Sequence, residues 1–95
     1  MDFEWDSAKA AANRRKHRVS FEEGQTIFGP AQPEIFEDEA HSDDELRFVA
    51  IGFSEKSRLL TVAFTRREST IRIVSVRRAT RREAKLYAKA KGQKG

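Results

Sequence analysis

The chain has 95 residues and no cysteine, with 19 lysines and arginines against 15 acids and a formal net charge of +4. This length supports one small domain with a modest core, and the lack of cysteine excludes a disulfide framework and a thiolate zinc site. No apolar run approaches the ~18 residues that span a membrane, and the first residues show no apolar export signal. We expect a cytoplasmic protein without membrane contact, with a single domain over residues 1–91 and a flexible tail over 92–95.

Acidic and basic residues are unevenly distributed along the chain. Residues 34–45 contain seven acids and no lysine or arginine, whereas residues 77–94 contain eight basic residues and one acid, Glu83. This segregation favours an anionic partner for the basic segments, and nucleic acid is the leading class. The alternative is a charged surface that only keeps the protein in solution.

A capping residue followed by strong helix formers predicts the first helix. Asp6 can accept hydrogen bonds from the first free N–H groups of "SAKAAANRRKH", and Phe3 and Trp5 precede it as anchors to the core. The helix ends in a dense basic run, made of Arg14, Arg15, Lys16, His17 and Arg18. Cations are favoured at the C-terminal end of a helix dipole, so this run is either a solvated helix end or a phosphate-binding surface.

Two capping boxes predict two further helices. Ser20 with Glu23, and Thr80 with Glu83, fit the pattern in which the hydroxyl and the carboxylate each satisfy the other residue's backbone N–H. The first box opens a short helix that ends before a glycine–proline pair, and the second opens a C-terminal helix that frays from Lys91. The expected core-facing residues of the short helix are Phe21, Gly24, Ile27 and Phe28.

Segments rich in β-branched and aromatic residues predict the strands. They are residues 46–54, 59–67 and 69–77, with a possible edge strand around Ile35 and short polar linkers that favour antiparallel hairpins. Strict alternation assigns one face of the second segment to Leu60, Val62, Phe64 and Arg66. It assigns one face of the third segment to Ile71, Ile73, Ser75 and Arg77. The predicted fold is α+β, with two N-terminal helices, a small antiparallel β-sheet of three to four strands and a C-terminal helix.

Arginines within or at the ends of the predicted strands are the strongest indication of function in the sequence. They are Arg47, Arg66, Arg67, Arg72, Arg77 and Arg78. A guanidinium group on a rigid strand can hold a phosphate through two hydrogen bonds. The alternative pairs these arginines with Glu45, Glu68 and Glu83 as structural ion pairs.

RNA cleavage is compatible with this composition and requires no metal. The ribose 2′-OH attacks its own phosphodiester when a base accepts the proton, cations stabilise the developing charge and an acid protonates the leaving oxygen. The available proton carriers are His17, His41, Glu45 and Glu68. His41 beside Asp43, Asp44 and Glu45 matches no recurring metal site, so we expect no metal and no cofactor.

The chain resembles the BrnT family, the toxins of bacterial type II BrnT–BrnA toxin–antitoxin pairs. The opening "FEWDSAKAAANRRKHRVSFEEG" is similar to the family pattern W-D-x-x-K-x-x-x-N-x-x-K-H-G-[VI]-x-F-E-E through Trp5, Asp6, Lys9, Asn13, Lys16, His17, Val19, Phe21, Glu22 and Glu23. The resemblance continues through His41, Glu45, Arg47, Gly52, Thr65, Arg66, Arg72, Ser75, Arg77, Ala79, Glu83 and Tyr87.

The resemblance implies a RelE-like fold and a toxic endoribonuclease. It also implies neutralisation by a BrnA-type antitoxin, with DNA bound only through that antitoxin. On this basis Arg66, Arg72 and Arg77 are expected to bind the phosphate and Arg47 to position it, with His17 or Glu45 as proton carrier. Further RNA contacts are expected from Lys16, Arg67 and Arg78. The rival hypothesis is a binding module that has lost catalysis and acts in operon autoregulation.

Two positions depart from the family pattern. Arg18 replaces the glycine that usually follows the histidine, so either the turn differs or the chain accepts left-handed strain there. Gly24 replaces a more usual alanine, which is expected to weaken the second helix slightly.

Overall fold

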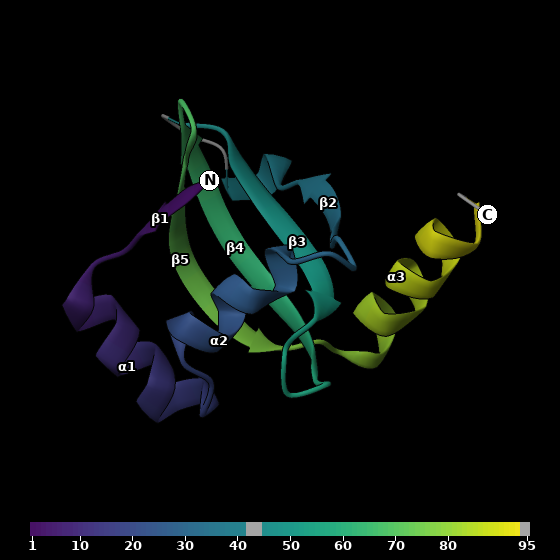
Figure 1. The fold of residues 1–95 in the computed structure, drawn as a ribbon, viewed down its shortest axis with the longest axis horizontal. Helices are drawn as coiled ribbons and strands as arrows, with labels where there is room; N and C mark the ends of the chain where they lie inside the picture. Colours follow the sequence, from purple (N-terminus) through teal and green to yellow (C-terminus); the bar gives the residue numbers. More distant parts are fainter. Residues whose placement is uncertain (42–44, 94–95) are drawn as a thin grey trace.

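A computed structural model describes residues 1–41 and 45–93 (Figure 1). Residues 42–44 of the acidic segment 34–45 therefore lie outside the described residues. The elements in chain order are β1 (Asp2–Glu4), α1 (Ser7–His17), α2 (Phe21–Gln25), the 3-10 helix η1 (Thr26–Phe28), β2 (Glu34–Glu37), the 3-10 helix η2 (Glu39–His41), β3 (Arg47–Phe53), β4 (Leu59–Arg67), β5 (Thr70–Arg78) and α3 (Arg81–Gln93). The predicted α+β class is confirmed. Among the described residues, each helix is too short or too polar to cross a bilayer.

The sheet has five strands in the order β1-β5-β4-β3-β2, and it is mixed. Strands β2 to β5 pair antiparallel as expected, with β2 as the edge strand around Ile35. The structure also has a strand that the sequence did not predict, β1, which pairs parallel with β5 and places Phe3 opposite Ile71. The prediction of a wholly antiparallel sheet was wrong at this edge, because three residues are too few to show a strand's alternation.

A β-bulge in β5 changes which residues face the core. The β4–β5 register shifts, so that Val74 has no partner in β4. Ile73 before the bulge and Val76 after it are therefore both buried, and Arg77 lies on the opposite face from them. This corrects the single face predicted for Ile71, Ile73, Ser75 and Arg77.

The main core lies between one face of the sheet and the N-terminal helices. We call this the core face, and its buried residues are Ala50, Leu60, Val62, Phe64, Ile71, Ile73 and Val76. Helix α2 crosses in front of this face, and its Phe21 is fully buried (Figure 1). Phe28 packs between the rings of Phe3 and Phe64, with centroid distances of 5.4 and 5.5 Å. The predicted core-facing residues of the second helix are thus confirmed.

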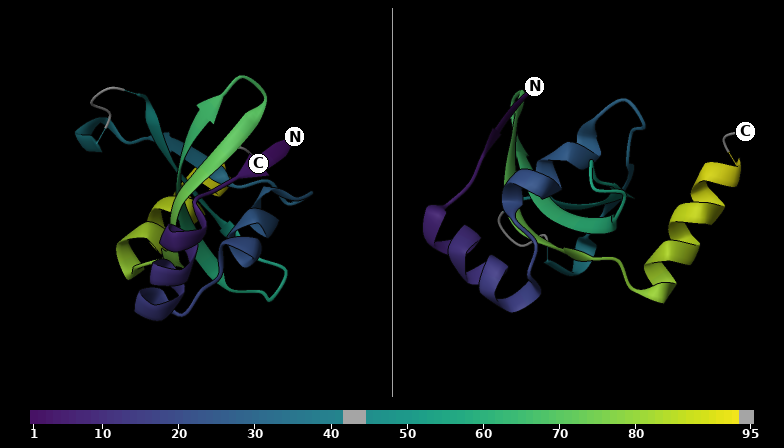
Figure 2. Two further views of the ribbon diagram at one scale, coloured as in Figure 1. Left: turned by 90° about the vertical axis from the view of Figure 1, so that its left-hand side faces the viewer. Right: turned by 60° about the horizontal axis from the view of Figure 1, so that its bottom comes forward.

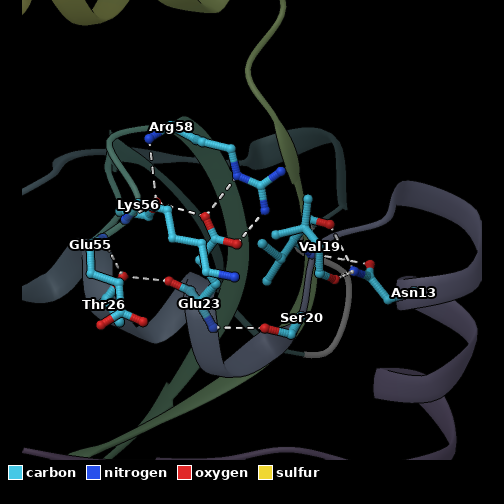
Figure 3. A network of polar contacts seen from close by, with 10 residues as sticks. Asn13, Val19, Ser20, Glu23, Thr26, Glu55, Lys56 and Arg58 are labelled. Atoms are coloured by element: carbon cyan, nitrogen blue, oxygen red, sulfur yellow. Dashed lines mark hydrogen bonds and ion pairs between the residues drawn. The ribbon is translucent and has the colours of Figure 1, made fainter.

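Helix α1 docks on the edge of β5 mainly through the side chain of Asn13, and its Ala10 packs against the core. Beyond β1, the edge of β5 has no neighbouring strand, and Asn13 occupies this position (Figure 3). Its amide nitrogen donates to the carbonyl of Val76 at 2.8 Å, and its oxygen accepts from the N–H of Val76 at 3.1 Å. The same nitrogen also donates to the carbonyl of Val19 at 3.1 Å. The buried amide therefore replaces a strand partner and closes the turn after α1.

The first capping box forms only in part. The N–H of Glu23 donates to Ser20 Oγ at 3.0 Å, as predicted. The Glu23 carboxylate does not return to Ser20. It accepts from Ser54 Oγ at 2.7 Å and from Arg58 Nε at 3.0 Å, in the loop between β3 and β4 (Figure 3). These bonds, above all those from Arg58, lower the pKa of Glu23 and keep a buried carboxylate ionised.

Helix α3 lies to the side of the molecule, beyond β3 and β2 (Figure 2). Its Tyr87 ring contacts Phe53 edge-on at 5.6 Å, and the Lys91 ammonium donates to two carbonyls before β2 at 3.0 and 2.8 Å. The predicted end near Lys91 was too early, because that lysine is anchored and the helix continues to Gln93. Residues 94–95 of the predicted tail lie outside the described part.

Candidate active site on the sheet

Four of the predicted arginines lie on the sheet face opposite the core face. The register places Arg47 of β3 opposite Thr65 of β4, and Thr65 opposite Arg72 of β5. Side chains in register on adjacent strands have Cβ atoms roughly 5 Å apart, so the two arginines flank the threonine in one row. We call this surface the arginine face, formed by Arg47, Arg67, Arg72 and Arg77.

Carboxylates hold three of these arginines. Arg67 Nε lies 3.1 Å from Glu45, and Arg72 Nη1 lies 2.5 Å from Glu4 of β1. Arg77 pairs with Glu83 at the start of α3. The ion pairs predicted as the alternative for Glu45 and Glu83 are therefore present. Each guanidinium keeps donors beyond those used by its carboxylate, because arginine carries five N–H groups.

A buried hydroxyl lies at the centre of the row. Thr65 is 5% exposed, and its Oγ1 has no hydrogen-bond partner among the described residues. A buried polar atom without a partner is uncommon in native proteins and calls for a specific explanation. The alternation of β4 predicts that Thr65 faces away from Phe64, but only the pairing of three strands places it between two arginines.

Glu83 joins the arginine face to α3. Its carboxylate accepts from both terminal nitrogens of Arg77 at 2.7 Å, from the Thr61 hydroxyl at 3.0 Å and from the Thr80 N–H at 2.9 Å. Its own N–H donates to Thr80 Oγ1, which confirms the second capping box. Arg77, followed by the Thr80 N–H and the Thr61 hydroxyl, lowers the pKa of Glu83 from 4.5 to about 2. Near neutral pH this carboxylate is therefore an anchor for Arg77 and not a proton carrier.

Residues 5–83 match the protein family described as "Ribonuclease toxin, BrnT, of type II toxin-antitoxin system". This range covers most of the chain, including every strand after β1. The chain belongs to the BrnT family. Membership in a family of type II toxins with ribonuclease activity implies an RNA substrate and a cognate antitoxin.

The fold agrees with a solved member of the BrnT family. The crystal structure of the Brucella abortus ribonuclease toxin BrnT superimposes with a TM-score of 0.66 at 23% identity, covering 85% of this chain and 99% of that one. At this identity the likeness concerns the fold alone. No individually curated protein matches the sequence.

The N-terminal BrnT pattern has a structural role in this fold. Trp5 packs edge-on against Phe21 at 5.8 Å, and Asp6 caps α1 by accepting from two backbone N–H groups. Asn13 docks α1 on β5, and Glu23 binds the β3–β4 loop. The most recognisable part of the sequence is therefore explained by folding, and the arginine face is built by the segments that follow it.

Several predicted site residues lie away from the arginine face. Arg66 is opposite Ile71 on the core face, where it borders an apolar cavity of about 100 Å³. Arg78 is exposed at the end of β5, opposite Leu60. Lys16 and His17 lie in the last turn of α1, beside the outer edge of β5 and not on either face of the sheet.

The predicted site residues with carboxylate or imidazole side chains also lie apart from one another. Glu45 lies at the rim of the arginine face through its contact with Arg67. His41, the last residue of η2, contacts Asp38 just before that helix, with Nδ1 at 3.0 Å from the carboxylate. Among the described residues no three histidine or acidic side chains converge as metal ligands. The metal site considered from the sequence, His41 with Asp43, Asp44 and Glu45, includes two residues, Asp43 and Asp44, that lie outside the described part of the chain.

Proposed function

We propose that this chain is an endoribonuclease that cleaves RNA without a metal ion, on the arginine face. The observation that carries the proposal is the row Arg47–Thr65–Arg72 in a chain of the BrnT ribonuclease family. The row supplies two cations on a rigid sheet with a hydroxyl between them. A phosphodiester above the row would receive hydrogen bonds from both guanidinium groups as negative charge develops during attack by the 2′-OH.

The other groups on this face have supporting roles in the proposal. Arg77, held by Glu83, and Arg67, held by Glu45, would bind the neighbouring phosphates. Glu45 is the proposed proton carrier because it lies at the rim of this face, whereas His17 lies in α1. Arg66 faces the core side of the sheet and is not included in the phosphate site.

Single-turnover cleavage of a defined RNA in EDTA tests this assignment. Arg47→Gln and Arg72→Gln should each slow cleavage by about a hundredfold, as expected when a donor to a developing oxyanion is lost. Arg66→Gln is the matched control, because it removes the same charge from the opposite face, and it should cut within about threefold of the wild-type rate. Equal losses for Arg66→Gln and Arg72→Gln would contradict the placement of the site, and loss of wild-type cutting in EDTA would contradict metal independence.

Thr65→Val gives an independent readout of the central hydroxyl. Valine keeps the shape of threonine and removes a buried polar atom without a partner, so the variant should be more stable by about 1 kcal/mol. It should nevertheless cleave RNA more slowly if the hydroxyl, which has no partner among the described residues, gains one when RNA binds. Faster unfolding together with slower cleavage would show only a folding defect.

We further propose that a BrnA-type antitoxin neutralises this chain and that the complex reaches DNA only through the antitoxin. A second candidate function is a non-catalytic module that binds antitoxin and nucleic acid. The ion pairs of Arg67, Arg72 and Arg77 favour it, because an arginine whose charge is neutralised by a carboxylate binds phosphate less readily. RNA that is bound but never cut by the purified protein, with the antitoxin complex intact, would favour this second function.

A further inference from the structure

The C-terminal end of α1 carries a second cluster of arginines, distinct from the arginine face. Arg14, Arg15 and Arg18 line an open hollow at the surface. Within the described residues none of the three makes an ion pair, in contrast to Arg67, Arg72 and Arg77. We call this surface the helix-end hollow. Its three guanidinium groups keep all their donors for a ligand.

The backbone of Arg18 is a second, independent observation. Arg18 is the residue after α1 and adopts the left-handed conformation, with φ 60° and ψ 30°. This conformation favours glycine, and non-glycine residues kept in it are concentrated at functional sites. Here it turns the chain so that the Arg18 side chain joins those of Arg14 and Arg15 around one hollow.

We infer that the helix-end hollow binds the phosphate backbone of the RNA that the arginine face cleaves, so this inference rests on the proposed function. Asn13 fixes α1 beside Val76, which places the end of α1 at the same end of the sheet as Arg77 and Arg78 (Figure 1). A strand of RNA lying across the arginine face can thus leave it past the end of β5 and reach the hollow. Contacts of this kind position the nucleic acid without reading its sequence.

The lining of the hollow favours RNA over an acidic segment of an antitoxin. Protein partners are anchored mainly by aromatic side chains and arginines that are seated in buried, desolvated pockets. The helix-end hollow is lined by arginines alone, whereas the apolar cavity lies on the core face and is bordered by Phe28, Phe48 and Phe64. An open, wholly cationic surface suits a repeating chain of phosphates.

The test measures binding of a short single-stranded 2′-O-methyl RNA, which cannot be cleaved, as a function of salt. The triple variant Arg14→Gln/Arg15→Gln/Arg18→Gln should bind this RNA about tenfold more weakly at low salt. Because three phosphate contacts are lost, the plot of log K against log salt concentration should become less steep by about 2 in slope. Lys9→Gln/Lys85→Gln/Lys89→Gln is the matched control, because it removes three exposed charges elsewhere. Its binding should stay close to that of the wild type.

Arg18→Gly separates binding from folding. Glycine relieves the left-handed backbone, so this variant should unfold at a higher temperature and still bind the RNA about threefold more weakly. In cleavage of an unmodified RNA the triple variant should show a raised KM with kcat unchanged. That pattern would mark the hollow as a binding site away from the reacting phosphate.

Each other outcome has a defined meaning. Equal weakening by the lysine control, or wild-type binding by the arginine variant, would overturn the inference. Loss of antitoxin affinity with unchanged RNA affinity would also overturn it and assign the hollow to protein docking. If the wild type binds but never cleaves RNA, while the arginine variant loses binding, the proposed ribonuclease activity is contradicted and RNA binding by the helix-end hollow is supported.

Discussion

At the scale of single residues, two departures from the BrnT pattern have opposite structural meanings. Arg18 occupies a left-handed turn, so the chain accepts the strain that a glycine would avoid. Gly24 is not a weak point of α2. A Cβ atom built on it would lie 2.5 Å from Val76 Cγ2, which is too close for any real contact, so glycine permits the helix to approach the sheet.

Replacing Arg18 with glycine should stabilise the fold. Left-handed φ is unfavourable for a residue with a Cβ, so Arg18→Gly should raise the free energy of unfolding by about 1 kcal/mol. Urea denaturation measures this change. Ala11→Gly, at an exposed position in the interior of α1, is the control and should lower stability by about 1 kcal/mol. Destabilisation by both variants would contradict the left-handed assignment.

Replacing Gly24 with alanine should destabilise the fold, despite alanine's higher helix propensity. The added methyl group overpacks the contact with Val76, and such insertions lower stability by about 1–3 kcal/mol. Val76→Ala makes room for the methyl group, so the double variant should be more stable than the sum of the two single changes predicts. Strict additivity in thermal or urea unfolding would show that Gly24 is not limited by Val76.

At the scale of elements, α3 is attached mainly by polar groups at its two ends. Glu83 binds Arg77 and Thr61 at its start, and Lys91 binds the segment before β2 near its end. No residue from 81 to 92 is buried. The helix is therefore held to the sheet by charge and hydrogen bonds more than by apolar contact.

The Glu83 anchor makes part of the stability depend on pH. Its pKa is lower in the folded state, about 2, than the ordinary value of 4.5. The contribution is therefore complete above about pH 4.5 and is lost as the pH falls toward 2. Glu83→Gln should lower the unfolding free energy by about 1–2 kcal/mol near neutral pH, allowing for solvent screening, with the difference vanishing near pH 2. Urea unfolding across this range measures it, and Glu55→Gln, at an exposed position, should change little at any pH.

At the scale of the whole molecule, protection should decrease from the sheet outward. β4 is central, hydrogen-bonded on both sides and mostly buried, whereas α3 has no buried side chain over residues 81–92. Local opening requires least free energy where apolar contact is sparse. Hydrogen exchange should therefore be slowest in β4 and faster in α3 than in α2. Equal protection of α3 and β4 would show that α3 is part of the cooperative core.

Local signals account for what could be predicted about the fold. Three helix N-termini could be predicted from the side chains that cap them, which are Asp6, Ser20 and Thr80. The bounds of β4 could be predicted from its composition and from the polar linkers on either side. β1 could not be predicted, because a three-residue strand is defined by its partner. The carboxylate of Glu23 was assigned to its own helix, because its true partner, Arg58, lies 35 residues away in sequence.

For the candidate site, the sequence by itself determined the residue types and the family: a strand-borne set of arginines in a BrnT chain. Only the tertiary structure decided which arginines share the arginine face. The bulge at Val74 moves Arg77 to the face that carries Arg72, and strand pairing brings Arg47 beside Thr65 while leaving Arg66 on the core face. The physical reason is that side chains alternate with a period of two, so one unpaired residue reverses the face of everything after it. Composition and spacing contain no signal for such a shift, because it is set by the fit of β5 against β4 and α2.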